Sequence, residues 1–399
     1  MSEVMMNNAA FEQAVERRHH YYIDAGFMFA AISLLCLGYI MVVSSSLHLG
    51  ERAFQNAAYY PLRQLAHIGV GLLLAYIAAR VPLKIWEQIG PNLILVAIVL
   101  LILVFIPGIG VKVNGSYRWI DLGVARLQIS ELVKLISVLY IAGFLTRHVV
   151  VVRESMKGFI RPLLPLGIIM GLLVAEPDFG ASFVIGFTVI CMMFLGGARW
   201  IEFITLVLMS VGLVVLAIVT SNYRMERVTA FLDPWADPLD SGFQLVQSFI
   251  AFGRGEWVGV GLGGSIQKLF YLPEAHTDFI FAVMGEELGL LGSCVVILLF
   301  GLFIWRAFQM GIAAERLNLR FCSLLAYGLG TWVGLQAFVN IAVNLGALPT
   351  KGLTLPYMSY GGSSMIVMCF VLGLLCRIHH ETKLCLEDKM KQRRPWQYA

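Results

Sequence analysis

Charged residues are scarce in this sequence: Asp, Glu, Lys and Arg make up only 14% of the 399 residues, whereas hydrophobic residues make up 59%. Because soluble globular chains carry about a quarter of charged residues, this scarcity excludes an ordinary soluble domain. The net charge is +4, and the basic residues form no block that would bind nucleic acid. The composition therefore predicts a polytopic membrane protein without a nucleic-acid partner.

Cysteine motifs and nucleotide motifs are also missing. The seven cysteines form no CxxC pair and no Cys/His cluster, which excludes a disulfide framework and a zinc site and favours small buried hydrophobes. The sequence has no Walker motif and no nucleophile elbow around a serine. The glycine-rich run at 259–264 lacks the strand and helix of a dinucleotide-binding motif, so we interpret it as a flexible loop.

Ten apolar segments predict an all-α membrane protein with ten transmembrane helices. They cover residues 26–43, 65–79, 93–106, 132–145, 163–175, 181–196, 203–220, 279–305, 321–343 and 365–375. Several are shorter than the roughly 20 residues that a spanning helix needs, so flanking residues must complete them. The fifth and sixth segments fit a second interpretation as well, a re-entrant hairpin that folds at residues 176–180. The first segment exceeds a signal-peptide core and is expected to remain as an anchor.

The distribution of positive charge predicts the orientation. Lys and Arg are more than twice as dense in the six segments on the side of the two termini as in the five segments on the other side. Because short cytoplasmic loops are enriched in Lys and Arg, both termini are predicted to be cytoplasmic. The chain then divides into a cytoplasmic segment 1–24, a transmembrane domain 25–377 with a large external loop 221–278 between spans 7 and 8, and a cytoplasmic tail 378–399.

The external loop contains its own helical pattern. Apolar residues at Phe243, Val246, Phe249 and Ile250 have the spacing of a short helix lying on the bilayer. Such a loop would roof a cavity whose ligand arrives from the lipid.

The end of this loop, LPEAHTDFIF at 272–281, carries the candidate catalytic residue. Thr277 is predicted to cap the following helix, which puts Asp278 in its first turn, where the helix N-terminus favours negative charge. A purely structural role as a helix-capping carboxylate stays open. Glu286 and Glu287 follow about 12 Å deeper at about 1.5 Å per residue, where a charge needs a partner, a water-filled cavity or a substrate.

Cations on the external side accompany Asp278. They are Arg118, Lys134, Arg224, Arg227 and Lys351. Glu131 and Lys134 share a helix face at i, i+3. Local ion pairing, snorkelling of lysine and contact with lipid headgroups would each explain single members of the set. Asp178, in the turn 177–180, is expected to be structural.

As a set, these residues suit an anionic, lipid-attached substrate. Cations would hold a pyrophosphate as it leaves, and the carboxylate would take a proton from an attacking sugar hydroxyl. The pattern thus describes a glycosyltransferase with a polyprenyl-pyrophosphate donor. Two other classes stay open: a transporter that flips the lipid-linked precursor, which Glu286 and Glu287 would suit, and a noncatalytic scaffold.

Three stretches resemble a known family. They are YRMERVTAFLDPWADP at 223–238, SIQKLFYLPEAHTDFIFAVMGEELG at 265–289, and residues 348–364. The chain resembles the SEDS family (shape, elongation, division and sporulation) of peptidoglycan glycosyltransferases over about residues 25–377, and within it the FtsW type. The rod-elongation type remains the alternative within the family.

The resemblance implies ten spans and polymerisation of lipid II into glycan strands at the outer face of the cytoplasmic (inner) membrane, with release of undecaprenyl pyrophosphate. It implies a location at the division septum and partnership with a class B penicillin-binding protein and other divisome membrane proteins. The family's essential aspartate matches Asp278, its Glu and Lys match Glu131 and Lys134, and its last-loop lysine matches Lys351. No cofactor is certain, and a requirement for Mg or Mn stays open.

The chain also departs from the family pattern. Members commonly have Gln-Pro-Ser-Glu where this chain has Gln128-Ile129-Ser130-Glu131, and Gln-Pro-Asp where it has Glu176-Pro177-Asp178. Glu176 therefore adds an acid near the proposed site.

Overall fold

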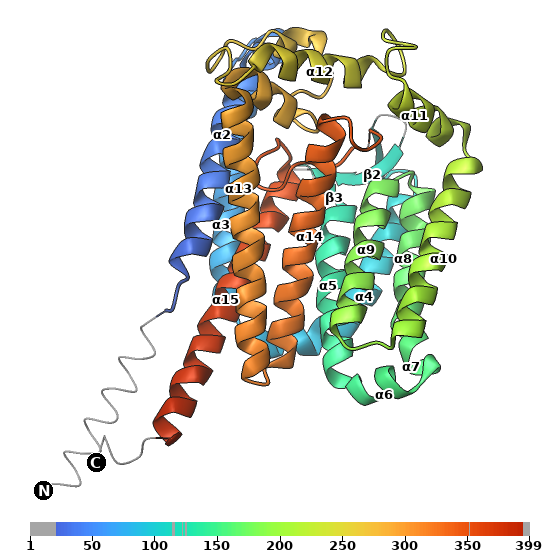
Figure 1. Cartoon of the computed structure of the whole chain (residues 1–399), viewed down its shortest axis with the longest axis vertical. Coiled ribbons are helices and arrows are strands. Elements are labelled where there is room, and N and C mark those ends of the chain that lie inside the picture. The colour runs from blue at the N-terminus through green and yellow to red at the C-terminus, as the bar shows by residue number, and fades with distance from the viewer. Residues whose placement is uncertain (1–20, 114–115, 122, 124–125, 351, 394–399) are drawn as a thin grey trace, which may run out of the picture.

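The computed structural model describes residues 21–113, 116–121, 123, 126–350 and 352–393. Its main body is a bundle of helices, with a small sheet and the external loop at one end (Figure 1). In the described chain, α2 begins and α15 ends at the opposite end of the bundle. We call the end that carries residues 221–278 the loop end.

Each of the ten predicted apolar segments forms one helix of the bundle. These are α2 (Ala25–Phe54), α3 (Tyr59–Arg80), α4 (Leu83–Val104), α5 (Ile129–Arg147), α8 (Leu163–Ala175), α9 (Phe179–Leu195), α10 (Trp200–Val219), α13 (Ile280–Arg316), α14 (Arg320–Asn344) and α15 (Gly362–Arg393). Eight segments of the described chain are long and apolar enough to cross a membrane, with α8 extended by α7, while α9 and the apolar part of α10 are shorter. The multi-pass helical membrane fold is confirmed, and the count of ten spans remains a prediction.

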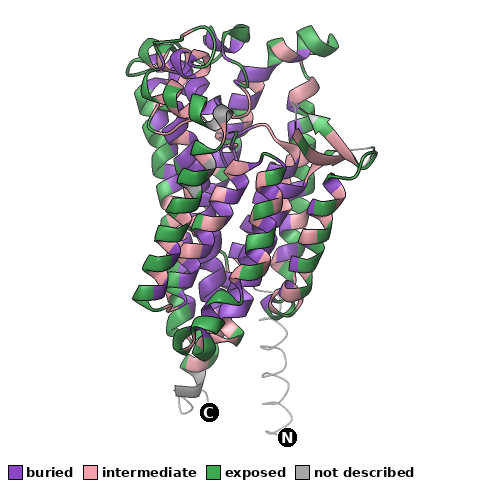
Figure 2. Cartoon of the chain, turned by 90° about the vertical axis from the view of Figure 1, so that its right-hand side faces the viewer, coloured by how far each residue is buried: buried purple, intermediate pink, exposed green. Residues whose placement is uncertain are grey.

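The central helices of the bundle are α5 and α14. In their most apolar windows, 89% of α5 and 83% of α14 are buried, against 22% of α3. Figure 2 shows buried residues on the inner faces and exposed ones around the periphery. Because α5 and α14 are enclosed by protein, polar side chains on them must find partners inside the bundle.

The outer faces of the bundle are apolar, as expected for helices that contact lipid. Among the cysteines, Cys322 and Cys369 are buried as predicted, whereas Cys36 and Cys294 are exposed on the bundle surface. The expectation of burial was wrong for these two residues because a bundle in lipid presents small hydrophobes outwards as well as inwards.

A three-stranded antiparallel sheet departs from the all-α prediction. Its strands are β1 (Gly110–Val113), β2 (Ser116–Asp121) and β3 (Arg126–Gln128), in the order β1-β2-β3. Val113 pairs with Ser116 across the dipeptide Asn114-Gly115, and Asn-Gly between alternating apolar residues is a strong hairpin signal. Because β3 ends where α5 begins, the sheet is fixed to the central helix and holds β2 at the loop end.

The external loop consists of α11 (Asn222–Leu232), α12 (Phe243–Gly255) and a short π-helix, η1 (Gln267–Tyr271). The predicted short helix is confirmed by α12, but α12 packs against α13 and buries Leu245, Val246 and Ala251. The loop therefore rests on the bundle itself. At the other end, α6 (Val149–Glu154) and α7 (Met156–Ile160) connect α5 to α8.

Helix α13 is interrupted at Gly289, which has a left-handed φ of 67°. Residues 256–261 of the external loop lie against this break. The main-chain N–H groups of Val260 and Gly261 donate to the carbonyl oxygens of Glu286 and Glu287, each over 3.0 Å. Two further hydrogen bonds run the other way, from Leu290 to Glu256 (2.9 Å) and from Leu291 to Trp257 (3.1 Å).

The interpretation of 259–264 as a flexible loop is therefore wrong at its start. Gly259 has a φ of 81°, and a Cβ atom there would collide with the carbonyl oxygen of Glu287. Glycine is needed because the loop backbone approaches α13 closely and in a left-handed conformation.

Candidate active site at the loop end of the bundle

Asp278 lies two residues before the first residue of α13, in a turn held by the neighbouring helix α14. Its main-chain oxygen accepts hydrogen bonds from Nδ2 of Asn340 (2.8 Å) and Nδ2 of Asn344 (3.0 Å). These bonds fix the backbone of Asp278, a residue of intermediate exposure, and do not involve its carboxylate. Asn340 and Asn344 are four residues apart on α14, so both amides lie on one face of the helix.

The predicted cap at Thr277 was wrong, and Asp278 is not in the first turn of the helix. The N-cap is Phe279, and the hydroxyl of Thr277 donates instead to the carboxylate of Glu274 (2.6 Å). The start of α13 is satisfied from outside, because Oδ1 of Asn344 accepts from the N–H of Ala282 (3.1 Å). A side chain of α14 thus replaces the local cap.

The last external loop, residues 352–361, encloses Asp278. Ser359 Oγ donates to the carbonyl oxygen of Thr277 (2.6 Å), and Asn340 Nδ2 donates to that of Leu353 (2.6 Å). Gly352 lies so close that a Cβ atom there would be 3.3 Å from Oδ2 of Asp278. Irregular backbone of this kind is tolerated in a membrane protein where it is buried in protein or lines a cavity. Lys351 itself falls outside the described residues.

Two of the predicted arginines approach Asp278 from different elements. Arg118, on β2, donates from Nη2 to the carbonyl oxygen of Pro177 (2.5 Å), and Arg227, on α11, donates from Nη1 to that of Thr350 (2.9 Å). Both arginines also act electrostatically on the carboxyl group of Asp278, so the structure brings these three predicted residues into one site. The side chain of Arg224 is outside the described part of the structure, although its backbone belongs to α11.

The surroundings of Asp278 shift its acidity. Burial raises the pKa of Asp278 to about 7, and Glu274 and Asp178 act in the same direction, whereas Arg227 and Arg118 lower it. A carboxyl group with a pKa near the working pH is suited to accept a proton, because it is ionised yet still basic.

Glu131 and Lys134 form the predicted pair, with 2.9 Å between Nζ and Oε1. The alternative that Lys134 snorkels to the interface does not hold, because its side chain is only 1% exposed. Its Nζ also donates to Oε1 of Gln336 (2.7 Å), whose Nε2 donates to the carbonyl oxygen of Thr354 (3.0 Å). Buried partners replace water around the cation. Lys134 is thus linked to the last external loop through the side chain of Gln336.

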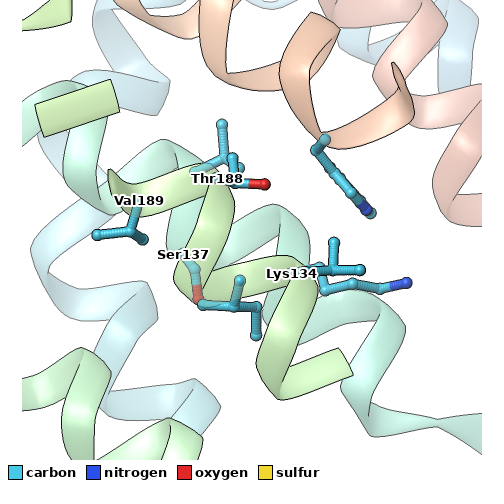
Figure 3. A pocket seen from close by; sticks show the side chains of 8 residues that line it. Lys134, Ser137, Thr188 and Val189 are labelled. Carbon is cyan, nitrogen blue, oxygen red and sulfur yellow. The ribbon is translucent and has the colours of Figure 1, made fainter. Parts of the chain in front are cut away.

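A small cavity lies beside Lys134, between α5, α9 and α14. Figure 3 shows Ser137, Thr188 and Val189 around it, together with Lys134. Its size suits about one water molecule, so it has no room for a sugar.

Glu286 and Glu287 have partners of their own and lie apart from this site. Glu286 accepts from Arg254 Nη1 (2.7 Å), from Ser265 Oγ and from the N–H of Ile266 (3.1 Å). Glu287 accepts from Lys268 Nζ (2.7 Å) and Ser44 Oγ (2.7 Å). These two acids bind the external loop to α13 and α2, which answers their need for partners.

The turn between α8 and α9 adds two acids. Asp178 caps α9, since Oδ1 accepts from the N–H of Ala181 (3.1 Å), which agrees with the structural role predicted for it. Glu176 is buried. The pKa of Glu176 is raised to about 8, mainly by burial and also by the charge of Asp178, while Arg118 acts in the opposite direction.

Sequence reasoning missed the polar residues of α14 that organise the site, Gln336, Asn340 and Asn344. Their spacing of four residues along an apolar helix puts them on one face, and polar residues inside a span are a functional signal. For metals, no group of three His, Cys, Asp or Glu side chains able to hold an ion occurs in the described residues.

Comparisons with known proteins identify relatives that cover most of the chain. The chain matches the FTSW_RODA_SPOVE family, described as cell cycle protein, over residues 25–384. It is 54% identical over 365 residues to the probable peptidoglycan glycosyltransferase FtsW of Methylococcus capsulatus, covering 90% of this chain and 91% of that one. It is 49% identical over 360 residues to the protein of the same name from Coxiella burnetii, covering 90% and 97%.

Solved structures show the same fold. A chain from a peptidoglycan synthase complex that coordinates polymerization and crosslinking has a TM-score of 0.73 and 30% identity, covering 91% of this chain and 98% of that chain. The rod shape determining protein RodA of Thermus thermophilus has a TM-score of 0.67 and 27% identity, covering 90% and 97%. Since the family match and these relatives cover nearly the whole bundle and both loops of the site, the chain belongs to the FTSW_RODA_SPOVE family of cell cycle proteins.

Proposed function

We propose that this protein is a peptidoglycan glycosyltransferase that polymerises lipid II into glycan strands during cell division and releases undecaprenyl pyrophosphate. The observation that carries the proposal is Asp278, a carboxylate with a fixed backbone and a pKa of about 7, beside Arg118 and Arg227 at the loop end. Relatives named FtsW and a related synthase complex support it.

In the reaction, Asp278 acts as the general base. As the acceptor hydroxyl oxygen attacks the anomeric carbon of the donor sugar, its proton passes to the carboxylate of Asp278. The bond between that carbon and the pyrophosphate oxygen breaks, and the electron pair leaves with the pyrophosphate. Attack from the face opposite the leaving group inverts the anomeric carbon.

The cations stabilise the leaving group. Arg118 keeps N–H donors beyond its two backbone contacts, and guanidinium groups such as those of Arg118 and Arg227 bind phosphate oxygens through charge-assisted hydrogen bonds. Arg224 and Lys351 complete the substrate-binding set in this proposal. Glu131 and Lys134 contribute indirectly, because Lys134 is linked to the last loop through Gln336.

The setting proposed for this activity is the outer face of the cytoplasmic membrane at the septum. Both termini are then cytoplasmic, and the loop end faces outwards, in accord with the excess of Lys and Arg at the other end. A class B penicillin-binding protein would crosslink the strands, a pairing supported by the synthase complex. Other divisome membrane proteins would join it, and the FtsW relatives favour the division role over rod elongation.

Replacement of the base tests the proposal. Asp278→Asn keeps the size of the side chain but removes its basicity, so purified protein supplied with lipid II should make glycan at least about 100-fold more slowly. The matched control is Asp240→Asn, an exposed aspartate of the same external loop, which should leave polymerisation unchanged. Glycan strands separated on a gel report the rate, and thermal unfolding in detergent reports folding. Undiminished polymer from Asp278→Asn would refute the assignment.

The alternative function, a transporter that flips the lipid-linked precursor, was favoured by the charges of Glu286 and Glu287. Glu286 and Glu287 are neutralised by Arg254 and Lys268, so they offer no free charge to a headgroup in transit. The same assay separates the classes, because flipping of lipid II leaves no chemical product.

A further inference from the structure

Glu176 is a buried acid whose carboxyl group has no hydrogen-bond partner among the residues that the structure describes. The residue is 1% exposed, and neither Oε1 nor Oε2 is hydrogen bonded within the described part of the chain. The other buried glutamates near the loop end differ from it. Glu131, Glu286 and Glu287 each face a Lys or Arg at 2.7–2.9 Å.

A cation is nevertheless close to Glu176, and it binds the backbone instead of the carboxyl group. Arg118 donates from Nε to the carbonyl oxygen of Glu176 (3.3 Å) and from Nη2 to that of Pro177 (2.5 Å). The same guanidinium acts electrostatically on both Glu176 and Asp278. Arg118 is therefore shared between the buried acid and the proposed catalytic base.

Burial and the charge of Asp178 oppose the ionisation of Glu176, whereas the charge of Arg118 favours it. Asp178 faces it from the turn before α9, and Arg118 faces it from β2. Helix α8 has no charged residue, and the charged residues of α4, Lys84 and Glu87, lie near its start, at the other end of the bundle. A buried carboxylate without donors and beside a second acid is strongly disfavoured, so the neutral form prevails in the resting site.

We propose that Glu176 is a positioning residue that must be protonated, because its neutral form leaves the Arg118 guanidinium on the backbone carbonyls and available to the pyrophosphate. When Glu176 ionises, its carboxylate takes Arg118 as a salt-bridge partner and withdraws it from the substrate. This inference rests on the proposed glycosyltransferase function and adds a second titrating group to the same site.

The two acids then set opposite limbs of the pH profile. Asp278 must be ionised to accept a proton, so activity rises as the pH passes about 7, the pKa of Asp278. Glu176 must be neutral, so activity falls as the pH passes about 8, the pKa of Glu176. The profile is expected to be bell-shaped.

Glu176→Gln tests the inference, because glutamine keeps the shape of a neutral acid and cannot ionise. Polymerisation of lipid II by purified protein is measured from pH 6 to 9.5, with KM and kcat resolved at each pH. At pH 7 the variant should match the natural protein within about twofold. At pH 9 the natural protein should have lost about tenfold, mainly through a higher KM for lipid II, whereas the variant keeps its activity, as expected for a group with a pKa near 8.

Three further variants make the test decisive. Glu176→Leu also lacks a titrating group and should lose the alkaline limb, which covers the case of a poorly folded Gln variant. Glu202→Gln alters a buried glutamate on α10, next to Arg199 and away from the site, and should keep the natural profile. In an Arg118→Ala background, Glu176→Gln should change nothing further, since the residue through which Glu176 acts is gone.

An alkaline limb that persists in both Glu176→Gln and Glu176→Leu would overturn the inference and leave the proposed function intact. So would a folded Glu176→Gln that is inactive at pH 7. Absence of glycan from the natural protein at every pH would instead overturn the proposed function, and this inference with it.

Discussion

Two groups of acids on one short stretch of chain have opposite surroundings. Glu286 and Glu287 are fully buried, and every carboxyl oxygen meets a donor from the external loop or from α2. Asp278 has its main-chain oxygen held by Asn340 and Asn344, while no described side chain donates to its carboxylate. The difference distinguishes the structural acids Glu286 and Glu287 from Asp278, the proposed general base, since a carboxylate whose oxygens all accept hydrogen bonds is a poor base.

The largest effect on stability is expected when a partner of Glu287 is removed. Lys268→Ala leaves that buried carboxylate with only Ser44, so the free energy of unfolding should fall by about 3–5 kcal/mol. Activity per folded molecule should stay near normal, in contrast to Asp278→Asn. Denaturant titration in detergent and the lipid II assay provide the two readouts. Loss of specific activity without loss of stability would place Glu287 with the chemistry.

A smaller effect is expected where the two regions meet, at Asn344. Asn344→Ala removes a donor to the Asp278 carbonyl and the acceptor that caps α13 at Ala282. Both stability and polymerisation should decline, stability by about 1–3 kcal/mol, because buried polar groups lose their partners. Phe338→Ala, on the exposed face of the same helix, is the control. An Asn344 variant with normal stability and rate would show that the hydrogen bond from Asn344 to the main-chain oxygen of Asp278 is not needed.

The smallest effect concerns the acidity of Asp278 alone. Glu274 raises the pKa of Asp278, so Glu274→Gln should lower that pKa and move the acid limb of the pH profile to lower pH. A shift of less than about one unit is expected, because Glu274 is exposed and solvent screens it. The rate at pH 6 should rise a few-fold and the rate at pH 8 should not change. A limb displaced towards higher pH would contradict the sign.

The sequence predicted most of the helical framework because apolar runs are local signals. Each run became one helix of the bundle, and the i, i+3 spacing correctly paired Glu131 with Lys134. The Asn114-Gly115 dipeptide also carried a local signal for the hairpin between β1 and β2, but the apolar pattern of the chain outweighed it.

The contacts that define the site were beyond local reasoning. Arg118 meets the backbone of Glu176 and Pro177, 58 and 59 positions along the chain, and the Asn344 amide reaches Asp278 across 66. No spacing rule relates residues so far apart. The sequence identifies the candidate charged groups. Which of them already have hydrogen-bond partners, and which remain available to a substrate, depends on how the loops fold back over α13 and α14.

Main-chain hydrogen bonds join residues 256–261 to α13 at its interruption, and they connect the largest loop to the helix that follows Asp278. Separation of the loop from α13 would break four main-chain hydrogen bonds and leave their donors and acceptors without these partners. A displacement of the loop would therefore be transmitted to the part of α13 that follows Asp278, so a partner that binds the loop could also shift the surroundings of this acid.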